Sequence, residues 1–340
     1  MKKTIAIFAV ICLITGAFIL TSCSAKKPAE ETGETAQAEK LSIVTTIFPE
    51  YDWVRQIMGD KADNAEITML LDSGVDLHSY QPTAADIMKL SNCDLFIYVG
   101  GESDGWAEDA LANRTNKDMT VINLLETLGD SVKEEETVEG MEHEEEHEHE
   151  KDHGHEEEHE EAEMDEHVWL SLRNTQVLVD EIAAKLGEAD PANKQTYLSN
   201  AAAYNKQLAD LDSQYKAAVD TASTKTLLFG DRFPFRYLVD DYGLEYYAAF
   251  SGCSAESEAS FETVSFLSAK IDELGLKNVM VIDNSDRKLA NTIIENTASK
   301  DATVLVLNSM QSTTSRDVGN GASYLSIMQS NLEVLKQALA

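Results

Sequence analysis

The chain has 340 residues, of which 27 are Lys or Arg and 61 are Asp or Glu, so its formal net charge is -34. This length exceeds what one core usually supports and predicts two lobes, and a hydrophobic content of 43% argues against a disordered chain. A surface this negative repels phosphate backbones, which excludes nucleic-acid binding and favours a small cation as the partner.

The first 22 residues are predicted to be a secretory signal. Lys2 and Lys3 precede an apolar run over 5–20, which is too short for a comfortable membrane span. The run ends in small residues directly before Cys23, which resembles the bacterial lipoprotein cleavage box. That resemblance implies that Cys23 becomes the first residue and carries acyl chains, which hold the protein to the outside of the cell membrane. A plain secretory signal with an incidental cysteine is the alternative.

The next segment, 23–40, has no apolar periodicity and is predicted to be a flexible tether. Strand and helix patterns then alternate. Strands are expected near 41–47, 66–71, 94–99 and 120–123, and amphipathic helices between them include 49–59 and 83–92. Such alternation indicates a parallel sheet that is covered on both faces.

A long helix is expected over 190–223, with Pro191 at its first position and a helically spaced apolar stripe from Tyr197 to Tyr215. A second strand set follows near 225–229, 244–249, 278–282 and 303–307. We therefore predict an α/β protein with lobes at 41–189 and 224–340, each a mostly parallel sheet flanked by helices. One long rigid helix would join them.

An acidic, histidine-rich segment interrupts the first lobe. Residues 134–166 hold 19 acids, one lysine and six histidines, so 133–166 is expected to be a disordered loop. Its histidines are His143, His147, His149, His153, His155 and His159. Imidazoles among carboxylates favour accessory capture of metals such as Zn²⁺, and a purely solubilising tract is the alternative. Two literal HExxH strings occur here, but a metalloprotease needs that motif on a packed helix.

Outside that loop the chain has two histidines, His78 and His167. His78 follows an expected strand, and His167 stands where the acidic loop re-enters the fold. In the second lobe, Asp231 and Asp283 follow expected strands, and ligands of open α/β sheets bind beyond the carboxyl ends of strands. If these side chains converge, two imidazoles and one or two carboxylates suit Zn²⁺ first and Mn²⁺ second.

The chain resembles the zinc- and manganese-specific solute-binding proteins of bacterial ABC importers. The matching stretches lie at 44–49, 76–83, 94–101 and 167–171, together with the long helix. The acidic histidine-rich loop resembles the zinc-importing branch in particular. This resemblance implies that His78 and His167 are the first and second metal ligands.

The remaining ligand positions depart from that family. The chain has Gly230 where the family usually carries a histidine or glutamate, so Asp231 is the expected substitute. Asn308 stands in place of the family's late aspartate, and an amide oxygen is a weak zinc ligand. Asp283 is ranked first to complete the shell, with Glu256, Glu258, Cys253 or a water as alternatives. Cys93 and Cys253 are expected either as thiols or as a disulfide, and a buried Cys253 without metal is preferred.

The expected function is that of a lipid-anchored, extracytoplasmic zinc receptor, a monomer and not an enzyme. The resemblance implies that it delivers the ion to a membrane ABC permease, which is powered by a cytoplasmic ATPase. A manganese receptor and a surface adhesin are the first alternatives, and a secreted zinc hydrolase is a less favoured one.

Overall fold

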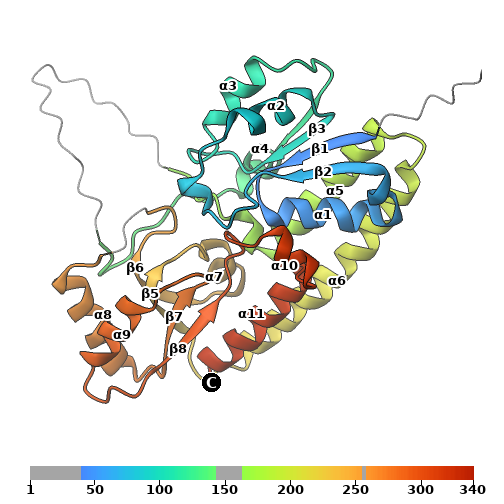
Figure 1. Ribbon diagram of the computed structural model, residues 1–340. Helices are drawn as coiled ribbons and strands as arrows, with labels where there is room; N and C mark the ends of the chain where they lie inside the picture. Colours follow the sequence, from blue (N-terminus) through green and yellow to red (C-terminus); the bar gives the residue numbers. More distant parts are fainter. Residues whose placement is uncertain (1–39, 143–162, 255–257) are drawn as a thin grey trace, which may run out of the picture. The chain divides into compact units, whose positions relative to one another are not determined.

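The computed structural model describes residues 40–142, 163–254 and 258–340. The described residues between Lys40 and Ala340 form a single packed unit (Figure 1). The predicted leader, residues 23–39 of the tether, Cys23 and the loop histidines lie outside the described residues. The expectation of disorder over all of 133–166 is wrong at its ends, because Glu134 pairs with Met164 and Glu166 is buried. Among the helices that are described, none has the length and apolar character that crossing a membrane requires.

The first half of the unit is built on a fully parallel four-stranded sheet in the order β2-β1-β3-β4. Its strands are β1 (Leu41–Thr45), β2 (Ala65–Met69), β3 (Leu95–Tyr98) and β4 (Thr120–Asn123). Its helices are α1 (Phe48–Met58), α2 (Ala84–Asn92), α3 (Trp106–Ala112), α4 (Leu124–Leu128) and α5 (Leu172–Ala189). Short 3-10 turns cover Gly59–Asn64, Leu77–Ser79, Gly129–Ser131 and Val168–Leu170. The four strands and the helices expected near 49–59 and 83–92 are confirmed.

Local chemistry accounts for several of these boundaries. Proline stands at the start of α1, where its missing N–H costs nothing. Thr83 and Asp86 form a capping box at the start of α2. The Ser171 hydroxyl accepts the first backbone N–H groups of α5, so this helix begins just after His167.

The long helix is α6 (Lys194–Asp220). Its predicted apolar stripe is buried throughout, from Tyr197 to Tyr215. The expectation of Pro191 at the first helical position is wrong, because α5 continues to Ala189 and a turn separates the two helices. Asp190 stabilises that turn by accepting hydrogen bonds from Asn193 Nδ2 and the Tyr197 hydroxyl, each at 2.7 Å.

The second half carries another fully parallel sheet, in the order β6-β5-β7-β8. Its strands are β5 (Thr226–Arg232), β6 (Glu245–Phe250), β7 (Asn278–Ile282) and β8 (Thr303–Leu307). Its helices are α7 (Arg236–Tyr242), α8 (Phe261–Leu274), α9 (Lys288–Glu295), α10 (Ser315–Gly319) and α11 (Tyr324–Ala338). All four expected strands are confirmed, and so is the α/β class with two parallel sheets.

Both faces of the second sheet are buried, as a parallel sheet requires. Along β5, Leu227 and Phe229 face the large core that also fills the first half, whereas Leu228 faces a smaller core beneath α8 and α9. The last helix ties the halves together. Tyr324 at the start of α11 donates its hydroxyl to the Trp169 carbonyl at 2.7 Å. The exact division into lobes at 189/190 and 223/224 stays a prediction.

Candidate metal centre

His78 lies beyond the carboxyl end of β2, on the turn Leu77–Ser79. Asp76 caps this turn, because its Oδ1 accepts the backbone N–H of His78 at 3.1 Å. The Nδ1 atom of the His78 ring lies 2.7 Å from the Ser103 hydroxyl, which follows β3. With Nδ1 engaged in this way, Nε2 is left to face the centre of the site.

His167 is fully buried and directly precedes the turn Val168–Leu170. One oxygen of Asp165 accepts its backbone N–H at 2.8 Å and lies 3.0 Å from its Nδ1. A carboxylate on Nδ1 fixes the ring and leaves Nε2 as the free donor, which is the usual arrangement around metal-binding imidazoles.

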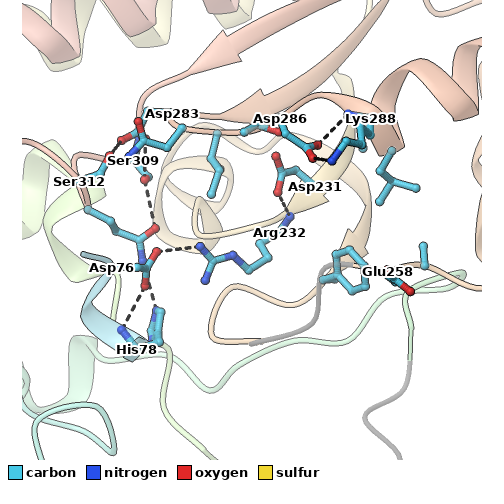
Figure 2. A pocket seen from close by; sticks show the side chains of 18 of the residues that line it. Asp76, His78, Asp231, Arg232, Glu258, Asp283, Asp286, Lys288, Ser309 and Ser312 are labelled. Carbon is cyan, nitrogen blue, oxygen red and sulfur yellow. Dashed lines mark hydrogen bonds and ion pairs between the residues drawn. The ribbon is translucent and has the colours of Figure 1, made fainter. Parts of the chain in front are cut away.

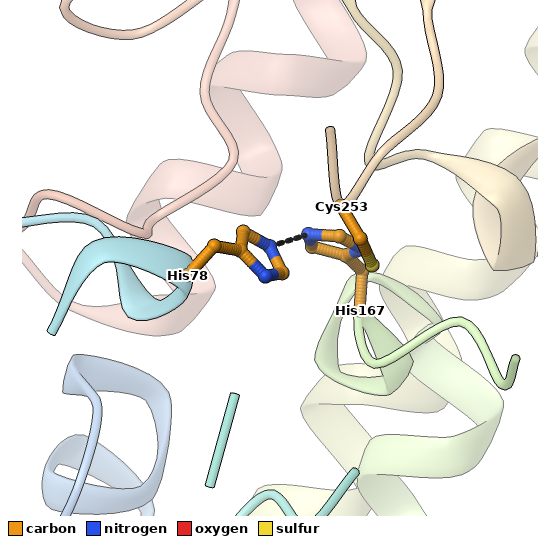
Figure 3. Close-up of side chains that lie close together, drawn as sticks. All are labelled: His78, His167 and Cys253. Carbon is orange, nitrogen blue, oxygen red and sulfur yellow. Dashed lines mark hydrogen bonds between the residues drawn. The ribbon is translucent and has the colours of Figure 1, made fainter. Parts of the chain in front are cut away.

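The two imidazoles meet in space. Their Nε2 atoms lie 3.1 Å apart, although the residues are far apart in the chain (Figure 3). Because both Nδ1 atoms have polar partners, the two Nε2 lone pairs point at one region. Two lone pairs directed at one point suit a cation that both nitrogens coordinate.

Buried carboxylates surround the pair. Glu166 accepts the Ser103 N–H through Oε1, while its Oε2 lies 3.6 Å from His78 Nδ1 and has no hydrogen-bond partner among the described residues. Burial raises the pKa of Glu166, and burial raises the pKa of Asp104 to about 7. Burial, followed by the charge of His167, lowers the pKa of His78 to about 3. The ring of His78 is therefore neutral near pH 7, as a metal ligand must be.

Gln311 is a member of this site that the sequence analysis missed. Its Nε2 lies 3.2 Å from His78 Nε2 and 2.9 Å from His167 Nε2. Gln311 follows β8, three residues after Asn308. The departure from the family at Asn308 was the sequence signal that could have drawn attention to this residue. Asn308 itself closes its loop, with Oδ1 accepting the Met310 N–H at 2.7 Å.

A hydrogen-bonded chain positions Gln311. The Ser309 hydroxyl lies 2.7 Å from Asp283 Oδ1 and 3.1 Å from Gln311 Oε1, and its single hydrogen cannot serve both. If the Gln311 amide is turned over, its NH₂ donates to Ser309, the hydroxyl donates to Asp283, and the amide oxygen faces the two histidines. An amide orientation is decided by such networks, so this side chain can present either atom to the site.

Cys253 lies in the loop after β6, and its thiol is free. Its Sγ and one ring nitrogen from each of His78 and His167 all lie within 4.8 Å of one another. Figure 3 shows the sulfur beside the His167 ring. Burial, and then the charge of Glu135, raises the pKa of the Cys253 thiol.

Asp231 and Asp283 line a cavity of about 800 Å³ that also reaches His78 (Figure 2). The Oδ1 atom of Asp231 accepts the backbone N–H of the next residue, Arg232, at 2.9 Å. Asp283 accepts hydrogen bonds from Ser309 N, Ser309 Oγ and Ser312 Oγ. The structure does not bring either carboxylate into the group formed by His78, His167 and Cys253. Their role as ligands stays a prediction.

Packing explains why position 230 carries glycine. A Cβ atom on Gly230 would lie 2.7 Å from Ala290 Cα and 2.9 Å from Ala290 Cβ, both in α9. A histidine there would collide with that helix, so the site must take its remaining donors from elsewhere.

Known proteins are similar to this chain in sequence and in fold. The family described as zinc-uptake complex component A, periplasmic (ZnuA), matches residues 43–338. The chain is 32% identical over 339 residues to the zinc-binding lipoprotein AdcA of Streptococcus pneumoniae (strain R6), covering 99% of this chain and 61% of that protein. It is 31% identical over 327 residues to the high-affinity zinc uptake system protein ZnuA of Bacillus subtilis, covering 96% of each.

Among solved structures, the Zn(II)-bound ZnuA-like domain of Streptococcus pneumoniae AdcA aligns with a TM-score of 0.66 at 29% identity. The alignment covers 88% of this chain and 99% of that domain. The chain thus spans 61% of the streptococcal protein and 99% of its ZnuA-like domain. From the match over residues 43–338, the chain belongs to the family of zinc-uptake complex component A.

Proposed function

We propose that the protein is an extracytoplasmic receptor that captures Zn²⁺ between His78 and His167 and hands it to a membrane ABC permease driven by a cytoplasmic ATPase. The observation that carries this proposal is the 3.1 Å approach of the two Nε2 atoms, with each Nδ1 held by a polar partner. Two relatives are named as a zinc-binding lipoprotein and a zinc uptake protein, which supports the same ion.

The site suits capture and release better than catalysis. His167 is fully buried and the side chain of His78 is 7% exposed, so both rings lie largely out of solvent at a cavity of about 800 Å³ that reaches His78. A zinc hydrolase needs an open coordination position with a base and room for a substrate. The HExxH strings lie outside the described residues and have no predicted packing, so the receptor is favoured over the enzyme.

Neutral imidazoles favour zinc, and the buried carboxylates around them compensate its charge. Manganese prefers carboxylate, carbonyl and water oxygens, so two histidines at the centre place it second. The acidic loop histidines are proposed to collect further zinc outside the central site. Cys23 is proposed as the lipid attachment that keeps the receptor, as a monomer, at the membrane surface.

Elemental analysis after zinc loading and dialysis tests the central site. The wild-type chain is expected to retain tightly bound zinc that His167→Ala loses, whereas His153→Ala, altered in the acidic loop, keeps it. Retention of that zinc by His167→Ala and by His78→Ala alike would contradict the proposal.

A further inference from the structure

The two imidazoles need donors from the second half of the chain, and a sulfur atom is at hand. One nitrogen of each histidine and Cys253 Sγ lie within 4.8 Å of one another. In a tetrahedral zinc site, neighbouring nitrogens are about 3.4 Å apart and a nitrogen and a sulfur about 3.6 Å apart. The Nε2 atoms, at 3.1 Å, are already near that spacing. Cys253 Sγ lies within 4.8 Å of a nitrogen of each ring, so the thiol has to move toward the two imidazoles to reach this spacing.

The loop that carries the thiol is held against His167. A Cβ atom on Gly252 would lie 3.1 Å from His167 Cε1 and 3.2 Å from its Nδ1, so the absence of a side chain lets the backbone approach the ring. On the other side, the Cys253 N–H donates to Glu135 Oε1 at 2.9 Å. Arg232 Nη1 donates to the Ser254 carbonyl at 3.3 Å. The thiol is therefore anchored at this spot by its own backbone.

The other candidate donors of the second half are weaker or less available. Gln311 lies beside both Nε2 atoms, but an amide oxygen is a weak ligand for zinc. Gly230 has no side chain, and α9 leaves no room for one. Asp283 already accepts three hydrogen bonds from Ser309 and Ser312. Within the described part of the chain, the group of donors around the two histidines contains Cys253 and neither Asp231 nor Asp283.

We propose, resting on the proposed zinc function, that Cys253 is the third protein ligand and binds Zn²⁺ as a thiolate. The Zn–S bond forms as the S–H bond breaks, and the proton passes to solvent. Thiolates prefer zinc and softer ions, whereas manganese prefers oxygen donors, so this ligand selects zinc over manganese. The nearby acids Glu135, Asp165 and Glu166 attract the dication that replaces the proton.

The test compares the full-length chain with its Cys253→Ser variant, and Cys93→Ser serves as the matched control. Cys93 is also a free thiol, but it is completely buried at the end of α2, away from the site. Each protein is titrated with Co²⁺, whose near-ultraviolet charge-transfer band reports thiolate coordination. Zinc and manganese affinities are then measured by competition with a chelator. The acidic loop has no cysteine, so it cannot produce that band.

Wild type and Cys93→Ser are expected to show the cobalt–thiolate band, and Cys253→Ser to lack it. We also expect Cys253→Ser to lose about tenfold or more in zinc affinity, while its manganese affinity changes much less. Equal zinc affinity and an unchanged cobalt spectrum in Cys253→Ser would overturn this inference and leave the zinc receptor standing. Failure of the wild-type chain to bind zinc would instead overturn the proposed function, and this inference with it.

Discussion

Arg232 Nη2 donates to Asp76 Oδ2 at 2.7 Å, and this ion pair joins the end of β5 to the turn that carries His78 (Figure 2). The other oxygen of Asp76 caps that turn at the His78 N–H. One carboxylate thus connects the second half of the chain to the orientation of the first predicted ligand.

Replacing Arg232 with methionine keeps much of the side-chain stem and removes the charge. The Oδ2 atom of Asp76 then loses its partner, although the side chain is four-fifths buried, which costs about 1–3 kcal/mol of unfolding free energy. We expect zinc to dissociate several-fold faster, because the turn that holds His78 is less firmly placed. Stopped-flow transfer of zinc to a chelator measures this rate. Arg236→Met is the control, because Arg236 pairs with Glu136 and Asp240 instead. Equal zinc dissociation rates in the two variants would show that the ion pair between Arg232 and Asp76 does not affect zinc release.

The buried His78 makes the metal-free protein sensitive to acid. Its pKa is about 3 in the folded chain, because of burial and then the charge of His167, against an ordinary value of 6.5. Well above pH 6.5 neither the folded nor the unfolded chain binds this proton. As the pH falls from 6.5 toward 3, the unfolded chain binds it and the folded chain does not, so stability is lost across that window.

The variant His78→Gln should therefore lose less stability than the wild type between pH 6.5 and pH 4. The expected difference approaches about 1.4 kcal/mol per pH unit, the contribution of one proton. Urea unfolding in the presence of a chelator, at several pH values, gives the two slopes. Parallel slopes for the two proteins would show that His78 does not carry this linkage.

Gln311 offers a way to change the metal preference. Changing Gln311 to glutamate places a carboxylate beside the Nε2 atoms of His78 and His167. In the wild-type chain these atoms lie 3.2 Å and 2.9 Å from the amide nitrogen of Gln311. Carboxylate oxygen is a better ligand than an amide for zinc and especially for manganese. We expect manganese affinity to rise about tenfold or more, and zinc affinity to rise less. Competition titrations with both ions measure the ratio, and Gln311→Ala should weaken both. A neutral outcome for Gln311→Ala would remove this side chain from the coordination shell.

The sequence predicted the strands and the two histidines of this site better than it predicted which side chains contact one another. Each strand was recognisable because a parallel strand is buried on both faces and reads as an apolar run. His78 and His167 stood out as the two histidines outside the acidic loop. Their approach depends on packing between distant segments, such as Tyr324 against Trp169, which no local pattern encodes.

The donors of the second half show the limit more sharply. Asp231 and Asp283 were chosen because both were expected to follow strands, but Asp231 lies within β5. The rule about strand ends still holds for Cys253 and Gln311, which follow β6 and β8. The rule does not say which residue of a loop points its side chain toward the metal site. The Asp283 carboxylate is held away from that role by the hydroxyls of Ser309 and Ser312, which donate hydrogen bonds to it. At Gly230 the obstacle is α9, which lies against its Cα.

The close approach of Gly252 to His167 leads to the last prediction. Changing Gly252 to alanine places a methyl group 2.9 Å from the Phe233 carbonyl and just over 3 Å from the imidazole. Since Asp165 holds that ring at Nδ1, the loop has to move, and Cys253 moves with it. We expect Gly252→Ala to lower zinc affinity about tenfold.

The control is Gly319→Ala at the end of α10, where an added Cβ meets nothing within 4 Å. That change should leave zinc binding intact and slightly stabilise the helix. Zinc competition assays on both variants decide the matter, and wild-type affinity in Gly252→Ala would mean that the loop position does not set the geometry of the site.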